Sequence, residues 1–157
     1  MMITQDQLHA LFQYVDGELI RNGKVAGSVN KQGYRIICVN YKMYKAHRLV
    51  FLYHHGYEPK QVDHIDGNKL NNKIENLRPA DNAKNMMNRG LMKNNTSGSK
   101  GVFFDKETNK WRVAIRFNTK LHSFGRFEDK ELAELVAIEA RNKYHKEFAN
   151  HGAQYGR

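Results

Sequence analysis

A stretch of small and polar residues at positions 91–99 divides this chain into two halves and limits what either half can form. It reads Leu-Met-Lys-Asn-Asn-Thr-Ser-Gly-Ser and lacks hydrophobic periodicity, which is typical of a linker. The chain has 157 residues in total, so each half has room for one small domain. We therefore expect a first domain at residues 1–90, a linker at 91–99, a second domain at 100–150 and a tail at 151–157.

The first half combines short helices with strands that are separated by glycines. Thr4 and Gln7 have the spacing of a capping box at the start of a helix, and Gly56 is placed to end a later one. The patterns of this half predict helices at about 5–13, 46–55 and 82–88, and strands at 34–39, 42–45, 61–66 and 76–78.

The second half predicts three antiparallel strands followed by an amphipathic helix. The strands are expected at residues 101–104, 111–117 and 121–127, and the helix at 129–148. A sheet covered on one face by a helix is a sufficient two-layer domain. Alternation along the middle strand turns its apolar residues toward the helix and leaves Arg112 and Arg116 on the open face.

The distribution of charge points to a polyanionic partner. The chain carries 26 Lys and Arg residues against 16 Asp and Glu residues, which gives a formal net charge of +10. Residues 86–126 hold 9 of the basic residues and 2 of the acidic ones, so this middle part is the most basic. Such a surface neutralises phosphates and releases their counterions, although a solvated basic surface without a partner is the alternative.

Some classes of protein are excluded by what the sequence lacks. The longest uninterrupted apolar run covers residues 49–53, far below the roughly 20 residues that a membrane span needs. The single cysteine, Cys38, rules out a disulfide framework and a zinc site built on a cysteine pair. The first residues lack the basic segment and apolar block of a secretory signal. We therefore expect an intracellular protein that is not secreted and has neither a membrane nor a small-molecule substrate as its partner.

Four polar residues of the first half have the types that phosphodiester hydrolysis requires. Asp63 and His64 are adjacent, and Asn76 and Asn85 follow at a distance. A hard divalent ion prefers oxygen ligands, which the carboxylate of Asp63 and the amide of Asn85 offer. A neutral imidazole near its usual pKa of about 6.5 can accept a proton from water, so His64 suits that step and Asn76 could orient it. Because successive side chains of a strand point to opposite faces, the strand has to end or bend at Asp63 and His64.

Three segments resemble the HNH endonucleases, most closely the homing-type group of bacteriophages and introns. They are the run Ala-His-Arg-Leu-Val at 46–50, the block at 62–78, and the polar stretch at 81–85. The resemblance implies an α+β domain of the ββα-metal fold, in which two strands and a helix hold one Mg²⁺ or Mn²⁺. For a phage-encoded protein it also implies the cytoplasm of a bacterial host.

The same resemblance assigns roles to individual residues. It implies that His64 is the general base, that Asp63 and Asn85 bind the metal, and that Asn76 orients His64. Asn85 stands where the family name has its last histidine, which is a known variant within the group. This exchange weakens the case for a nitrogen-rich site that would prefer zinc.

Other polar residues of the first half have simpler interpretations. Arg48 at a helix start is a candidate DNA contact that clamps a phosphate, with an ion pair to an acidic neighbour as the alternative. Asn71 and Asn72 are interpreted as turn formers in an asparagine-rich loop. His54 and His55 are interpreted as cations that stabilise a helix end.

A second resemblance covers about residues 97–150. Motifs at 97–102, 111–115 and 124–127, followed by an alanine-rich helix, look like an AP2 DNA-binding domain. By residue-wise analogy, Lys100, Arg112, Arg116 and Ser123 are expected to contact DNA. The sequence departs from the family at Ala114 and Leu121, so the family's base preference does not carry over. AP2 modules are frequently joined to HNH nucleases in phage genomes, which agrees with the linker.

Together these features predict a metal-dependent, homing-type DNA endonuclease that acts on double-stranded DNA as a monomer. One active site cuts one strand, so a monomer should nick. A non-catalytic AP2-type DNA-binding regulator with a degenerate nuclease domain is the alternative from another class. A third hypothesis is a nuclease that acts on RNA. A preference for structured RNA as the substrate would indicate this activity.

Overall fold

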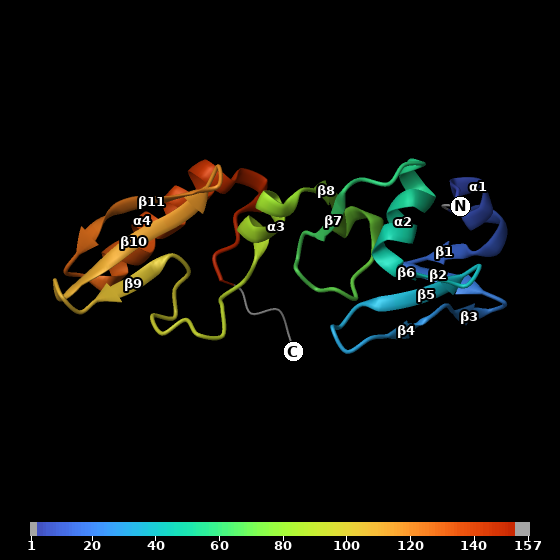
Figure 1. The fold of residues 1–157 in the computed structure, drawn as a ribbon, viewed down its shortest axis with the longest axis horizontal. Helices are drawn as coiled ribbons and strands as arrows, with labels where there is room; N and C mark the ends of the chain where they lie inside the picture. Colours follow the sequence, from blue (N-terminus) through green and yellow to red (C-terminus); the bar gives the residue numbers. More distant parts are fainter. Residues whose placement is uncertain (1–2, 153–157) are drawn as a thin grey trace. The chain divides into compact units, whose positions relative to one another are not determined.

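The computed structural model describes residues 3–152, and the contacts within it divide the chain into two compact units, residues 1–81 and 82–157 (Figure 1). Each unit has its own cluster of buried hydrophobic side chains. Both units combine helices with small antiparallel sheets, which confirms the predicted mixture of α and β structure. The ββα-metal and AP2-like arrangements stay predictions.

The first unit consists of two helices and eight short strands within its described residues. In chain order they are α1 (Gln5–Leu11), β1 (Gln13–Val15), β2 (Glu18–Arg21), β3 (Lys24–Val25), β4 (Ser28–Val29), β5 (Arg35–Val39), β6 (Lys42–Lys45), α2 (Ala46–His55), β7 (Gln61–His64) and β8 (Leu77–Ala80). A short 3-10 helix, Ile74–Asn76, precedes β8. The strands form the sheets β1-β2-β3 and β4-β5-β6 and the pair β7-β8.

The local signals at the helix ends act as the sequence predicts. Gln7 N donates to Thr4 Oγ1 at 3.3 Å and Thr4 N donates to Gln7 Oε1 at 3.0 Å, which completes the capping box of α1. Gly56 ends α2 in the left-handed conformation, with a φ of 73°. Helix α1 ends at Leu11, earlier than predicted, because Phe12 adopts an extended backbone and buries its ring.

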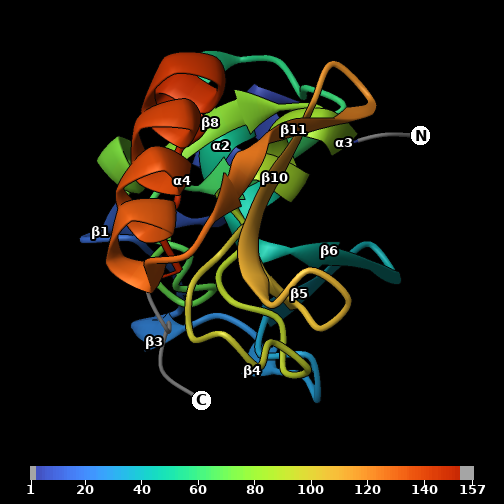
Figure 2. The ribbon, with the colours of Figure 1, turned by 90° about the vertical axis from the view of Figure 1, so that its left-hand side faces the viewer.

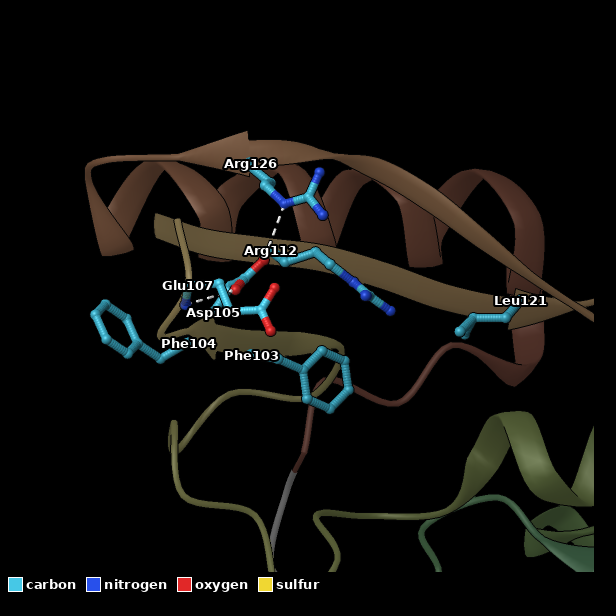
Figure 3. A pocket seen from close by; sticks show the side chains of 7 residues that line it. All are labelled: Phe103, Phe104, Asp105, Glu107, Arg112, Leu121 and Arg126. Carbon is cyan, nitrogen blue, oxygen red and sulfur yellow. Dashed lines mark hydrogen bonds and ion pairs between the residues drawn. The ribbon is translucent and has the colours of Figure 1, made fainter. Parts of the chain in front are cut away.

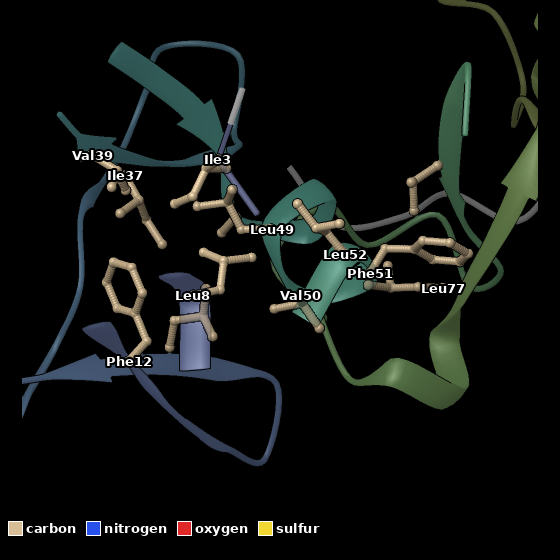
Figure 4. Packing of buried hydrophobic residues seen from close by; sticks show 13 residues of the cluster. Ile3, Leu8, Phe12, Ile37, Val39, Leu49, Val50, Phe51, Leu52 and Leu77 are labelled. Atoms are coloured by element: carbon tan, nitrogen blue, oxygen red, sulfur yellow. The ribbon is translucent and has the colours of Figure 1, made fainter. Parts of the chain in front are cut away.

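Helix α2 lies at the centre of the core of the first unit. Leu49, Val50 and Phe51 are each at most 2% exposed. Figure 4 shows Leu49 and Val50 on the side of Leu8, whereas Phe51 lies beside Leu77 of β8. Full burial of a side chain of this size stabilises a fold by roughly 1.5–3 kcal/mol. Packing on α2 therefore fixes the pair β7-β8 relative to the helix α1.

The boundary between the units differs from the predicted linker. The first unit ends at residue 81, so α3 (Asn82–Asn88) belongs to the second unit. The physical reason is a set of hydrogen bonds inside that unit. Lys100 Nζ donates to the carbonyls of Met87 at 2.6 Å and of Arg89 at 2.5 Å, which ties the end of α3 to the segment before the sheet. The predicted linker is thus a loop of the second unit.

The second unit consists of α3, a three-stranded sheet and a long helix. Its further elements are β9 (Val102–Asp105), β10 (Lys110–Phe117), β11 (Lys120–Phe127), α4 (Lys130–His145) and a 3-10 turn, Lys146–Phe148. The antiparallel sheet has β10 in the middle, and α4 lies along one of its faces (Figure 2). Asp129 caps α4, because its Oδ1 accepts from Leu132 N at 2.8 Å. Of the predicted tail, residues 153–157 lie outside the described residues.

Candidate active site

The Asp63–His64 pair lies at the end of β7, which runs antiparallel to β8. Asp63 stands opposite Arg78 in the register, and His64 stands opposite Leu77. The strand ends at His64, whose carbonyl accepts a hydrogen bond from Gly67 N at 3.0 Å in the turn that follows. This confirms that the strand ends at the pair, and His64 contacts the polar loop between β7 and β8 through Asn72.

His64 is buried and is held by a residue that the sequence did not single out. It is 5% exposed, and its Nε2 lies 3.0 Å from Oδ1 of Asn72, which is 2% exposed. If the amide oxygen accepts this bond, Nε2 is the protonated nitrogen of the ring. Burial lowers the pKa of His64 by more than the bond to Asn72 raises it, so the ring is neutral at neutral pH. Asn72 thus positions His64, beyond the turn-forming role interpreted from the sequence.

Asn76 fixes the two residues that follow His64. Its Nδ2 donates to Asp66 Oδ1 at 2.9 Å and to the Asn71 carbonyl at 2.8 Å, and its Oδ1 accepts from Asp66 N at 3.0 Å. Its main-chain carbonyl accepts from Ile65 N at 2.8 Å. Asn76 therefore acts on the backbone next to His64, whereas Asn72 contacts the ring. The predicted orienting role of Asn76 is compatible with this indirect action and stays a prediction.

The carboxylate of Asp63 is bound by Arg78 across the strand pair. Arg78 Nη2 and Nε lie 2.9 and 3.0 Å from Asp63 Oδ2. Both side chains are 13% exposed, so the ion pair is largely shielded from water. A divalent ion at Asp63 would therefore share this carboxylate with a guanidinium group.

The donor atoms predicted for the metal fit a hard cation with few protein ligands. Mg²⁺ is commonly bound by one or two carboxylates, with waters and substrate phosphates completing its shell. Asp63 offers a carboxylate and Asn85 an amide oxygen, so the pair suits this mode of binding. Among residues 3–152, no group of three His, Cys, Asp or Glu side chains forms a richer site. Asn85 lies on α3 in the second unit, and its part in the site stays a prediction.

A ring cluster, formed by Tyr34, His47 and His64, lies next to two lysines. The His47 ring stands edge-on to His64 with centroids 4.8 Å apart, and Tyr34 lies 5.4 Å from His47. The Nζ atoms of Lys45 and Lys69 lie 4.2 and 4.9 Å from the Tyr34 centroid. Burial, followed by repulsion from His64 and Lys45, lowers the pKa of His47 to about 3. The cluster places ammonium groups near two neutral imidazoles, and this arrangement suits an anionic phosphate. The sequence shows no periodicity that predicts the cluster.

Arg48, a predicted DNA contact, ties α2 to the segment that leads into β7. Its Nη2 and Nε lie 2.5 and 2.6 Å from Glu58 Oε1. Its Nη1 and Nη2 donate to the carbonyls of Lys60 at 3.2 Å and Pro59 at 3.1 Å. This is the ion pair that the sequence left open as the alternative. A phosphate contact by Arg48 stays a prediction, and it requires the phosphate to compete with Glu58.

The predicted DNA contacts of the second unit fall into two groups. Arg112, Arg116 and Ser123 lie on β10 and β11, and Arg116 and Ser123 are exposed. Lys100 instead binds the carbonyls at the end of α3. Burial and the charge of Arg141 lower the pKa of Lys100 to about 8. Lys100 is thus bound within the second unit, and contact with DNA stays a prediction for all four residues.

The face of the sheet that carries Arg112 also has an open hollow of about 460 Å³ (Figure 3). Arg112 stands between its register partners Phe103 and Arg126. Arg126 Nε donates to Asp105 Oδ2 at 3.1 Å, whereas Arg112 Nε is buried without a hydrogen-bond partner among the described residues. Phe103 is 50% exposed. Phe103 and Arg126 extend the predicted contact face, and only the register across the three strands reveals them.

Comparisons with known proteins agree with this geometry. A model of the HNH endonuclease family matches residues 44–87, a stretch that contains Asp63, His64, Asn76 and Asn85. Protein 3.8 of Escherichia phage T7 is 38% identical to the chain over 113 residues, which are 69% of this chain and 91% of Protein 3.8. The chain belongs to the same family as Protein 3.8, and it carries an HNH endonuclease domain.

The HNH domain supports a nuclease, a kind of hydrolase, with DNA as its substrate. The matched stretch also includes His47 and Asn72, which contact His64 and to which the sequence assigned no part in the active site. No solved structure gives a significant match to the chain. Among residues 3–152, no helix combines the length and the hydropathy that crossing a membrane requires.

Proposed function

We propose that this member of the family is a metal-dependent, homing-type DNA endonuclease that nicks one strand at a preferred site. The observation that carries the proposal is the hydrogen bond between His64 and Asn72, beside Asp63 at the end of β7. Together with the lowered pKa of His64, it supports a neutral imidazole in a fixed orientation, which is what the activation of water needs.

In the proposed reaction, the neutral imidazole of His64 takes a proton from a water molecule. The oxygen of that water attacks the phosphorus while the bond to the 3′ oxygen breaks. Asp63 and Asn85 are the residues that would hold Mg²⁺ or Mn²⁺, and the bound ion supplies stabilisation of the charge on the phosphate and the leaving oxygen. Asn72 keeps the imidazole in the required tautomer, and Asn76 holds the backbone that carries it.

Binding of double-stranded DNA is proposed for the open face of the second unit. Arg112 and Arg116 lie on β10 and Ser123 lies on β11, and the resemblance to an AP2 domain supports DNA contacts by these three residues. Phe103 and Arg126 add an exposed ring and a further guanidinium group. Strands with arginines on an open face can enter the major groove, and the charge of the region favours phosphate contacts.

One active site in each chain supports a monomer that nicks, since a double-strand break would need two cutting events. The cytoplasm of a bacterial host is the proposed setting, and the phage origin of Protein 3.8 supports it. Preference for one site is proposed to come from the second unit, because the chemistry of the first unit acts on any phosphodiester.

A supercoiled plasmid tests the function directly. The wild-type protein with Mg²⁺ should convert it to the nicked circle, and His64→Ala should abolish nicking while DNA affinity changes by no more than about tenfold. His55→Ala, at the exposed end of α2, is the matched control and should nick normally. Unchanged turnover in His64→Ala would refute the mechanism. Binding without nicking by the wild type would establish the regulator instead, and preference for structured RNA would establish the RNA-directed nuclease.

A further inference from the structure

The turn between β5 and β6 holds Tyr41 in a left-handed backbone conformation, which asparagine and glycine adopt more readily than tyrosine. Asn40 and Tyr41 are the two loop residues of this hairpin, and their φ angles are 49° and 61°. Two-residue loops with positive φ prefer asparagine and glycine, because other side chains crowd the left-handed backbone. Tyr41 is fully exposed, with a relative accessibility of 103%, so no packing among the described residues offsets this strain. Strain of this kind is commonly kept at functional sites.

The open face of the sheet β4-β5-β6 leads from this turn toward the candidate active site. Ile37 and Val39 of β5 are buried on the opposite face. The register therefore turns Met43 and Lys45 of β6 to the open face. Met43 is 68% exposed, and Lys45 Nζ lies 4.2 Å from the centroid of Tyr34 in the ring cluster. Lys45 thus links this face of β6 to Tyr34, whose ring centroid lies 6.4 Å from that of His64.

The surrounding segment is strongly electropositive. Residues 19–57 contain seven Lys and Arg residues and no Asp or Glu. Arg35 and Arg48 pair with Glu18 and Glu58, which lie just outside the segment, so the rest of the charge belongs mainly to lysines of the sheets. A fully exposed ring on a lysine-rich hairpin has the chemistry of the wedges that proteins insert into the minor groove of DNA.

We propose that the β5-β6 hairpin enters the minor groove of double-stranded DNA and inserts Tyr41 between two base pairs. This inference rests on the proposed function and adds a second DNA contact, within the nuclease unit itself. Partial unstacking at the wedge kinks the duplex. Because Tyr41 and His64 belong to the same compact unit, the position of the kink selects the phosphate that reaches His64.

The test measures base unstacking independently of cleavage. A His64→Ala background binds DNA without cutting it, and a mixed-sequence duplex carries single 2-aminopurine bases at successive positions. Binding should raise the fluorescence at one base step, because 2-aminopurine brightens when it is unstacked. Adding Tyr41→Gly should abolish the rise and weaken binding about tenfold, the usual size of one lost base–aromatic contact. A duplex with unpaired bases at that step should restore the affinity of the Tyr41→Gly protein.

Two controls separate the wedge from the fold. Asn40→Gly changes the same turn but keeps the ring, so fluorescence and affinity should be retained. The Tm of Tyr41→Gly should equal or exceed that of the parent, since glycine fits this turn better. Full fluorescence and affinity in Tyr41→Gly would overturn the proposal. If the wild type fails to nick a plasmid while the Tyr41-dependent rise persists, the nuclease function fails and the wedge stands.

Discussion

Replacing His47 by phenylalanine should make the first unit less sensitive to acid. His47 is 5% exposed, and burial is the main reason that its pKa falls to about 3. In the unfolded chain the same ring has its usual pKa of 6.5. Between these two values the unfolded state binds a proton that the folded state does not, so stability falls as the pH falls from 6.5 toward 3.

The size of the effect follows from the two pKa values. Between pH 7.5 and pH 5, linkage to one such histidine lowers the free energy of unfolding by about 2 kcal/mol. For a unit of this size, that corresponds to a decrease of roughly 10 °C in Tm. His47→Phe keeps a ring edge-on to His64 and has no nitrogen to titrate, so its Tm should lack this part of the decrease.

Scanning calorimetry at the two pH values provides the measurement, because it records the unfolding of both units. The control is His55→Phe, which alters an exposed histidine at the end of the same helix and should keep the wild-type decrease in Tm. Equal decreases in the wild type and in His47→Phe would refute the argument. They would mean that His47 titrates in the folded protein much as it does in the unfolded chain.

Three further predictions concern the polar contacts of the two units. Asn72→Leu removes the acceptor at His64 and should lower the single-turnover nicking rate about ten- to a hundredfold without weakening DNA binding, whereas Asn72→Asp keeps an acceptor and should lose less. Replacing Arg112 and Arg116 by Ala should weaken DNA binding and reduce the salt dependence by about one to two counterions, with little change in nicking at saturating DNA. Burial lowers the pKa of Lys100 from 10.5 to about 8. Between pH 8 and pH 10.5 the unfolded state therefore binds more protons than the folded state. The stability of the second unit should therefore rise over that pH range in the wild type but not in Lys100→Met, as followed by Trp111 fluorescence.

Each of these predictions has an outcome that contradicts it. A wild-type rate in Asn72→Leu would show that the bond to His64 is not needed for orientation. Normal affinity with a collapsed saturating rate in the double arginine variant would show that this face does not anchor DNA. Parallel pH curves for the wild type and Lys100→Met would show that burial does not shift the titration of Lys100.

The sequence by itself determined the features that depend on near neighbours in the chain. The capping box of Thr4 and Gln7, the glycine that ends α2 and the Asp129 cap of α4 are satisfied within a few residues, so their spacing predicts them. The pattern of residues predicted the strand β7 two residues too long, and the need for the strand to end or bend at Asp63 and His64 gave its end. Alternation along β10 likewise predicted that Val113 and Ile115 would be buried.

The tertiary structure decided which polar side chains meet. Asn72 and Asn71 look alike in the sequence, yet only Asn72 points into the core and contacts His64, because the loop between β7 and β8 folds back over the strand. Arg48 and Lys100 carry charges that suit phosphate, and the fold also brings carbonyls and a carboxylate within hydrogen-bond distance of them. Partners far apart in sequence are chosen by packing, since a buried polar group has to find its hydrogen bond wherever the fold places one.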